Sequence, residues 1–283
     1  MLVQSPNPVL PYLTQARAPL TFETVAVNEF GETTTVSIPA ERALTLYVDK
    51  RELVTLMTLG AHPELLVLGY LLNQRLITSA QDVESITVDW EVGAAAVKTR
   101  GGIADIEAKT AKRVVTTGCG QGSVFGDMMG DIDSIHLPEA TLAQTQLYGI
   151  VNAIRLKEST YKSAGSVHAC ALFKGGDLLT FVEDVGRHNA IDTIAGWMSM
   201  QTAMPTADKI FYTTGRLTSE MVIKSAQMGV PIVVSRSGIT QMGQAVAARL
   251  RLCAIGRATN KRFLVYSGVH RLVFQDDAAP PRL

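Results

Sequence analysis

The chain has 283 residues, of which 47% are hydrophobic and 18% charged, so it can bury one large core or two packed ones. Its 26 basic and 26 acidic side chains cancel, which argues against a protein that binds nucleic acid through counterion release. We find no apolar run of about 18 residues for a membrane span, no signal-peptide pattern, and three widely spaced cysteines that make no disulfide framework. We therefore expect a soluble cytoplasmic protein.

The N-terminal part is predicted to be an α+β region over residues 21–135. Residues 1–20 carry four prolines and are expected to form an extended or disordered lead-in. Strand-like segments follow up to about Val97, with one helix starting near Pro63, where proline suits the first turn. That helix is apolar nearly all round, which predicts that it is buried. Residues 98–136 are rich in glycine and small polar residues, which is typical of a functional or disordered loop.

Residues 136–283 are predicted to form a second, α/β domain. It opens with an amphipathic helix from Pro138-Glu139, then a hairpin around Gly175-Gly176-Asp177, then a helix that Asn189 is expected to cap. A strand–helix alternation comes next, with strands at 210–213, 232–235 and 252–255 and helices at 218–228 and 240–250. This series predicts parallel strands joined by right-handed crossovers.

Two strand-to-helix turns, Thr214-Gly215-Arg216 and Ser235-Arg236-Ser237-Gly238, are candidates for ligand binding. Each is expected at the carboxyl end of a strand and before a helix N-terminus, where free N–H groups and an arginine favour phosphate. Two such turns on neighbouring strands predict a phosphate-bearing ligand in the crevice. The alternative is that they are ordinary capping loops with solvated arginines.

The segment EDVGRHNAID gathers polar side chains after a strand that looks buried, among them Glu183, Asp184, His188 and Asn189. Burying so many polar groups is costly unless they bind a ligand or one another. We keep both interpretations, a binding site and an internal polar network. A catalytic triad with His188 as the base lacks an indicated nucleophile.

The three cysteines differ in their surroundings. His168-Ala169-Cys170 resembles part of a zinc deaminase motif, but Cys170 stands where the motif needs glutamate and the chain contains no P-C-x-x-C, which argues against zinc. Cys170 and Cys253 are predicted to be apolar strand residues. Cys119 is flanked by glycines and follows several basic residues, which favours an exposed, reactive thiolate. A loop cysteine without function is the alternative.

Taken in order, several segments resemble the formate dehydrogenase accessory sulfurtransferase family (FdhD). The matching stretches, spread over roughly residues 20 to 272, include TTGCG, YKSAGSVHACAL, FVEDVGRHNAIDTIAG and GRATNKRFLVY. The resemblance implies a cytidine-deaminase-like, three-layer α/β fold without zinc over residues 136–283, beside a smaller β-rich N-terminal domain. It also implies a sulfurtransferase-type accessory protein that forms a homodimer.

By this resemblance Cys119 takes persulfide sulfur from a cysteine desulfurase and passes it to the bis-molybdopterin guanine dinucleotide cofactor. Formate dehydrogenase or a related molybdoenzyme then receives the cofactor. The family's cofactor-binding segment matches Arg257-Ala258-Thr259-Asn260-Lys261-Arg262, whose basic side chains suit a pyrophosphate. Together with it, the residues expected to contact the cofactor are Thr214, Gly215, Arg216, Ser235, His188 and Asn189, and no metal ligands are expected.

The chain departs from the family pattern at Gly122, which stands where the family usually has the second cysteine of C-x-x-C. One thiol can carry a persulfide, but it cannot close a disulfide within the loop. This departure favours an alternative in which the protein binds and delivers the cofactor, or serves another molybdenum enzyme, without sulfur chemistry. A zinc hydrolase acting on nucleobases is a third hypothesis, and the missing ligands argue against it.

Overall fold

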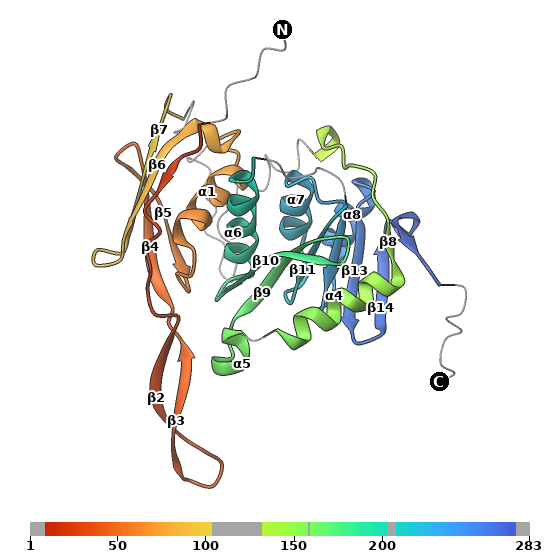
Figure 1. Cartoon of the computed structure of the whole chain (residues 1–283), viewed down its shortest axis with the longest axis horizontal. Coiled ribbons are helices and arrows are strands. Elements are labelled where there is room, and N and C mark those ends of the chain that lie inside the picture. Colours follow the sequence, from red (N-terminus) through yellow and green to blue (C-terminus); the bar gives the residue numbers. More distant parts are fainter. Residues whose placement is uncertain (1–8, 104–131, 158, 203–207, 276–283) are drawn as a thin grey trace.

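The computed structural model describes residues 9–103, 132–157, 159–202 and 208–275, which fold into two sheet-containing parts joined by a pair of helices (Figure 1). The N-terminal part is built on a five-stranded sheet of order β1-β6-β7-β4-β5. Its strands are β1 (Tyr12–Leu13), β4 (Arg42–Val48), β5 (Arg51–Thr58), β6 (Val83–Asp89) and β7 (Ala94–Thr99). A separate two-stranded ribbon consists of β2 (Thr21–Val27) and β3 (Thr33–Pro39).

Part of the predicted lead-in, residues 1–20, is held against the N-terminal sheet. Within residues 1–20, β1 pairs in parallel with β6, with Tyr12 opposite Ser85. The side chain of Glu64 also holds this segment, because it accepts hydrogen bonds from Thr14 Oγ1 at 2.8 Å and from Ala16 N at 2.6 Å. Of the two expectations for the lead-in, extended or disordered, the structure shows an extended path at Tyr12–Leu13, which sheet pairing and hydrogen bonds hold in place.

The C-terminal part is built on a six-stranded sheet of order β10-β9-β11-β12-β13-β14. Its strands are β9 (His168–Lys174), β10 (Asp177–Asp184), β11 (Lys209–Thr213), β12 (Ile232–Ser235), β13 (Cys253–Thr259) and β14 (Arg262–Ser267). Strands β11, β12 and β13 run parallel, and β9 and β10 form an antiparallel hairpin. The predicted hairpin and the predicted strand–helix alternation are both confirmed.

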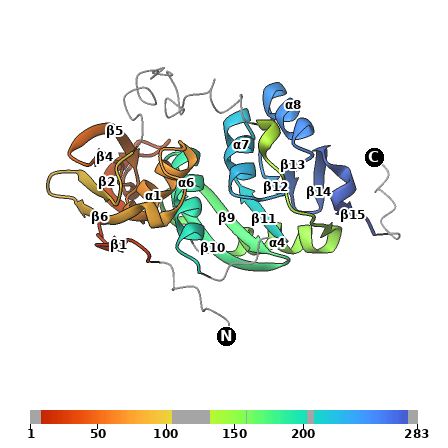
Figure 2. The same cartoon turned by 90° about the horizontal axis from the view of Figure 1, so that it is seen from above.

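Helices cover both faces of this sheet (Figure 2). One face packs against α6 (Arg187–Ser199), α7 (Ser219–Gln227) and α8 (Gln241–Arg249), and the other against α4 (Gln144–Leu156). The short helix α5 (Thr160–Ala164) follows α4, and β8 (Leu142–Ala143) pairs with β15 (Leu272–Val273). Short 3-10 turns lie at Ala80–Asp82, Ile132–Ser134 and Val269–Arg271. A mixed α/β fold is confirmed, while its likeness to cytidine deaminase in particular stays a prediction.

Two predicted helix starts are wrong. Helix α4 begins at Gln144 rather than at Pro138, because the preceding residues are drawn into an extended path that ends in β8. Arg271 fixes this path by donating from Nη1 to the carbonyl oxygen of Pro138 at 2.8 Å. Helix α6 begins at Arg187 with Gly186 as its N-cap, so Asn189 lies inside the helix and does not cap it.

The two parts meet where α1 (Pro63–Asn73) crosses α6. A Cβ atom on Gly69 would lie 1.6 Å from the carbonyl oxygen of Asp192, and one on Gly196 would lie 2.0 Å from that of Leu65. Only glycine allows the two backbones to approach this closely. The crossing buries α1 between the N-terminal sheet and α6, which confirms the predicted burial of this apolar helix. No helix in the described ranges is long and apolar enough to cross a membrane.

Candidate functional site: a basic cavity and a buried polar joint

The two predicted turns lie side by side at the carboxyl ends of β11 and β12. Ser235 Oγ donates to the carbonyl oxygen of Gly215 at 2.7 Å, and it accepts from Ser237 N at 2.9 Å. The backbone N–H of Arg236 donates to Thr213 O at 3.0 Å. The first turn is also tightly packed, since a Cβ atom on Gly215 would lie 2.7 Å from Cδ of Arg187. The hydroxyl of Ser235 is therefore occupied within the protein.

A cavity of about 290 Å³ opens beside these turns, between the sheet and the helices α4 and α5. Four of the predicted cofactor-binding residues line it, namely Thr214, Ala258, Thr259 and Asn260. Four cationic side chains also line it, Arg155, Lys157, Lys162 and Arg236. We call this space the basic cavity. Its floor is apolar and aromatic, with Val151, Ile154, Phe181 and Tyr212 among the lining residues.

The charge around the basic cavity is mostly positive. Lys157 Nζ lies 5.1 Å from the centre of the Phe181 ring, a cation–π contact. Burial raises the pKa of Tyr212 to about 12, and the charge of Arg236 counteracts that rise. Glu183 is the carboxylate in the lining, and its two oxygens accept hydrogen bonds from Thr160 N at 2.6 Å and Tyr161 N at 3.2 Å. The cavity therefore suits an anionic ligand with an aromatic or apolar portion.

The segment 257–262 forms the end of the β13–β14 hairpin. Arg257 and Asn260 adopt positive φ values of 52°, and the strand pairing is irregular between Gly256 and Thr259. Arg257 N donates to the carbonyl oxygen of Ser237 at 2.7 Å, which ties the hairpin to the turn after β12. Lys261 lines a second cavity of about 410 Å³, which shares Val151, Arg155 and Asn260 with the basic cavity. The lining of the basic cavity does not include Arg257, Lys261 or Arg262.

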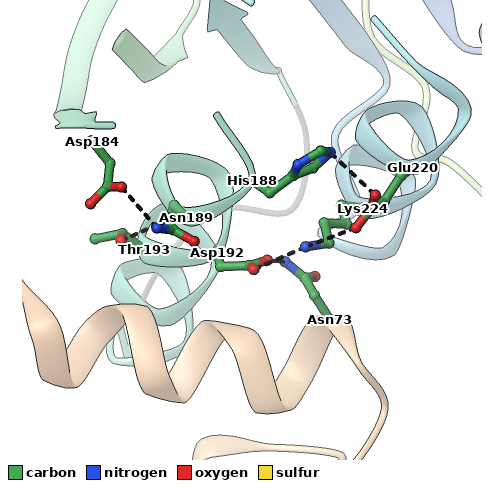
Figure 3. A network of polar contacts seen from close by, with 8 residues as sticks. All are labelled: Asn73, Asp184, His188, Asn189, Asp192, Thr193, Glu220 and Lys224. Atoms are coloured by element: carbon green, nitrogen blue, oxygen red, sulfur yellow. Dashed lines mark hydrogen bonds and ion pairs between the residues drawn. The ribbon is translucent and has the colours of Figure 1, made fainter. Parts of the chain in front are cut away.

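The segment EDVGRHNAID forms an internal polar network that links both parts of the molecule (Figure 3). Asp184 accepts hydrogen bonds from Thr58 Oγ1 and from Leu59 N, both in the N-terminal part. Asn189 Nδ2 donates to Asp184 Oδ1 at 2.8 Å and to the carbonyl oxygen of Met57 at 2.6 Å. These bonds hold the C-terminal end of β5 against the end of β10 and the first turn of α6.

The same network continues between helices α1, α6 and α7. Lys224 Nζ lies 2.9 Å from Asp192 Oδ2 and 3.5 Å from Glu220 Oε1, and Asn73 Nδ2 donates to Asp192 Oδ1 at 2.7 Å. His188 Nε2 lies 3.2 Å from Glu220 Oε2. Lys224 and Asp192 are both fully buried. We call the whole network, from Thr58 and Asp184 to His188, the polar joint.

The burial of the polar joint favours one of the two interpretations of this segment, the internal network. Its side chains are buried, with 3% of His188 and 4% of Asn189 exposed, and neither residue lines the basic cavity. Burial is the main cause that raises the pKa of Asp184, of Asp192 and of Glu220, while the charge of Lys224 counteracts it for Asp192 and Glu220. An internal network that joins two parts of the fold is what the geometry supports.

Cys119 falls in residues 104–131, outside the described ranges. The other two cysteines behave as predicted, since Cys170 lies in β9 and Cys253 in β13, both fully buried. Burial raises the pKa of each thiol to about 12, so neither is a thiolate near neutral pH. Within the described ranges no three His, Cys, Asp or Glu side chains gather in a way that could hold a metal ion.

The lining residues of the basic cavity that the sequence did not predict include Arg155, Lys157, Lys162 and Phe181. The sequence does contain part of the evidence for a basic site, because Arg155, Lys157 and Lys162 fall within eight positions at the end of an amphipathic helix. From the sequence alone, such a cluster indicates a solvent-exposed helix end. The fold instead places it beside the carboxyl ends of the strands.

Comparisons with known proteins fit this two-part α/β architecture. The family model of the FdhD/NarQ family matches residues 39–273, so the chain belongs to that family. The sulfur carrier protein FdhD of Listeria monocytogenes serotype 4b (strain F2365) is 29% identical over 240 residues, which cover 83% of this chain and 91% of that protein. The sulfur carrier protein FdhD of Staphylococcus haemolyticus (strain JCSC1435) is 28% identical over 242 residues, which cover 84% of this chain and 90% of that protein.

A solved structure shares the fold. The crystal structure of a protein described as a formate dehydrogenase accessory protein, from Desulfotalea psychrophila, superposes with a TM-score of 0.72 and 24% sequence identity. The alignment covers 90% of this chain and all of the other. The two-part fold is therefore shared with this protein.

Proposed function

We propose that this protein is a sulfur carrier that accepts persulfide sulfur on Cys119 and passes it to the bis-molybdopterin guanine dinucleotide cofactor. The observation that carries the proposal is the long match to proteins named sulfur carrier protein FdhD, together with Cys119 between two glycines in TTGCG. The recipient of the finished cofactor is formate dehydrogenase or a related molybdoenzyme, and the setting is the cytoplasm.

The first step is a thiolate exchange with the persulfide of a cysteine desulfurase. The Cys119 thiolate attacks the outer sulfur of the donor persulfide, the donor S–S bond breaks, and a new S–S bond forms on Cys119. The donor cysteine leaves as a thiolate, so the step needs no external oxidant or reductant. Gly122 leaves no second thiol at that position to displace this sulfur within the loop.

The basic cavity is the place where the chain would hold the cofactor's nucleotide end. Arg155, Lys157 and Arg236 provide charge for the phosphates, and Phe181 and Tyr212 provide aromatic surface for the base. Thr214 and Asn260 add polar groups at the rim. These residues are chemically suited to a guanine nucleotide, which supports the cofactor as the substrate.

The sulfur step is tested by incubating the protein with a cysteine desulfurase and cysteine and measuring its intact mass. We expect wild type to gain the mass of one sulfur atom and Cys119→Ala to gain none. Cys253→Ala removes a buried thiol and is the matched control, which should gain sulfur as wild type does. A wild type without the added sulfur, or Cys119→Ala with an undiminished gain, would contradict the proposal.

Gly122 favours one alternative, in which the protein binds and delivers the cofactor without sulfur chemistry. Under this alternative, Cys119→Ala would still mature the client enzyme to normal activity. A Gly122→Cys variant separates the two further. If Cys119 carries a persulfide, the new thiol should convert it to a disulfide within the loop and release sulfide, which mass analysis and a sulfide assay detect.

A further inference from the structure

A second cavity, of about 410 Å³, lies between α4 and the turn that joins β13 to β14. It shares Val151, Arg155 and Asn260 with the basic cavity, so the two spaces border each other along α4. The proposed function uses only the basic cavity. Cavities of roughly 300–1,000 Å³ are usual for one small-molecule site, so the two together offer room for a ligand with two ring systems.

The second cavity has open space beside α4 because a glycine lies on the helix face that lines it. Gly149 is exposed, and a Cβ atom there would meet no atom within 4 Å. Tyr148, Asn152 and Arg155 lie on the same side of the helix and also line the cavity. A glycine inside a helix costs stability relative to alanine, so this position gives up stability and leaves space. A larger side chain at position 149 would occupy that space.

The polar groups of the second cavity favour an anion. Arg155 and Lys261 are cationic, and no carboxylate is among the described residues that line this space. Arg155 Nη2 donates to Asn152 Oδ1 at 2.8 Å, so these two side chains offer a ligand mainly N–H groups. Phosphate oxygens accept hydrogen bonds from such groups. Because Arg155 lines both cavities, the phosphates of one bound molecule are expected at this shared border.

The end of the second cavity that the basic cavity does not share carries an aromatic side chain. Tyr148 lines it, and the centre of the Tyr148 ring lies 6.2 Å from that of Phe263. Phe263 in turn stacks on Phe274, with ring centres 6.5 Å apart. Gln144 Nε2 donates to the hydroxyl of Tyr148 at 2.6 Å, which holds the ring in place. An aromatic side chain held in this way offers a surface to a planar ring system at a low ordering cost.

We propose that the two cavities form one trough for a pyrophosphate-linked dinucleotide, with one ring system in each cavity and the pyrophosphate at Arg155. This inference rests on the proposed function, because it takes the basic cavity as the site of the guanine nucleotide. The second cavity then receives the group that the pyrophosphate joins to that nucleotide, which in the proposed cofactor is the pterin. Gly149 determines specificity in this arrangement, since the space beside it admits a dinucleotide where the basic cavity alone would bind a mononucleotide.

The test compares two probes by calorimetry on the full chain. One is guanosine diphosphate and the other is diguanosine diphosphate, in which a pyrophosphate links two guanosines. The second probe carries less negative charge, so tighter binding must come from its second guanosine. We expect one molecule of either probe per chain, and we expect wild type to bind diguanosine diphosphate about tenfold more tightly, the effect of stacking one further ring. Arg236→Ala should weaken both probes by a similar factor, since Arg236 lines the basic cavity alone.

Gly149→Leu fills the second cavity and is the decisive variant. It should bind guanosine diphosphate as wild type does, and it should bind diguanosine diphosphate no more tightly than that. Ala153→Leu is the matched control, because Ala153 is an exposed residue of α4 outside the lining of both cavities, and this variant should keep the preference. Thermal melting checks the fold, and Gly149→Leu should melt above wild type because leucine favours a helix more than glycine does.

Equal affinity of wild type for the two probes would overturn this inference and leave the proposed nucleotide site standing. The same holds if Gly149→Leu keeps the preference or if Ala153→Leu loses it. Two molecules of guanosine diphosphate per chain would also overturn it, since the second cavity would then be a separate site. A wild type that binds neither probe would contradict both the nucleotide site and the trough.

Discussion

The polar joint and the basic cavity both lie at the carboxyl end of the C-terminal sheet, and both are rich in polar residues. In the joint every carboxylate faces a donor of the same chain, and the side chains are buried between α1, α6 and α7. In the cavity four cationic side chains are among the lining residues, and the lining carboxylate, Glu183, is bound to backbone N–H groups. Polar density alone therefore does not mark a binding site. A surplus of one charge beside a cavity is the more informative sign.

The largest effect is expected from breaking the buried ion pair of the polar joint. Asp192→Ala leaves the fully buried Lys224 without its nearest carboxylate, which should lower the free energy of unfolding by about 3–5 kcal/mol. Urea denaturation measures this loss. Glu84→Ala removes the exposed partner of Lys98 and should cost less than about 1 kcal/mol. Equal losses in the two variants would contradict the expected difference between the buried ion pair and the exposed one.

The second effect concerns the helix crossing that the joint surrounds. Gly69→Ala forces a methyl group against the backbone of α6 and should cost about 3 kcal/mol. Gly149→Ala places the same methyl group in open space on α4, where replacing a helical glycine should stabilise by about 0.5–1 kcal/mol. Thermal or urea unfolding compares the pair. The close packing of α1 and α6 would be in doubt if both substitutions were neutral.

Ligand binding should respond only to changes in the cavity. Arg236→Ala and Lys157→Ala each remove a lining charge, which should weaken binding of guanosine diphosphate by roughly 10- to 100-fold, a loss of about 1.5–3 kcal/mol. Calorimetry measures the affinity, and the unfolding midpoint should stay unchanged. Arg216→Ala is the matched control, since Arg216 lies in the neighbouring turn and outside the cavity lining. Equal losses in all three variants would argue against the basic cavity as the nucleotide site.

The smallest effect is a change in how stability depends on pH. Burial raises the pKa of Glu220 above its ordinary value of 4.5. At pH values between 4.5 and the raised pKa, Glu220 in the folded protein keeps a proton that the unfolded chain has released. The stability of the folded state therefore falls as the pH rises through this window. Glu220→Gln cannot lose that proton, so its stability relative to wild type should increase as the pH rises. Urea denaturation from pH 4 upward tests this, and parallel curves would contradict it.

The C-terminal strands and helices could be predicted well because their signals are local. The apolar runs that became β11 and β12 and the glycine and proline after α7 act over a few residues. The starts of α4 and α6 could not be predicted in the same way. Distant contacts accompany both starts, since Arg271 donates to Pro138 O ahead of α4 and Asn189 donates to Met57 O from the first turn of α6.

The candidate site was predicted only in part for a similar reason. Thr214, Ala258, Thr259 and Asn260 meet in one cavity as expected, because parallel strands bring their carboxyl ends to one edge of the sheet. His188 and Asn189 lie at the same edge but point into the joint, and no local pattern distinguishes the two directions. The lining cations of α4 and α5 belong to the opposite face of the sheet, which only the tertiary fold brings to this edge.

The crossing of α1 and α6 also has a consequence for how the chain is synthesised. The pair from Asn73 to Asp192 spans 119 positions, so the ribosome adds that stretch before the two can meet. At about 5–20 residues per second this takes roughly 6–24 s, during which the face of α1 that packs on α6 has no permanent cover. Newly made chains should therefore depend on a chaperone until α6 emerges. Slow translation through residues 74–187 would lengthen that exposure and favour aggregation.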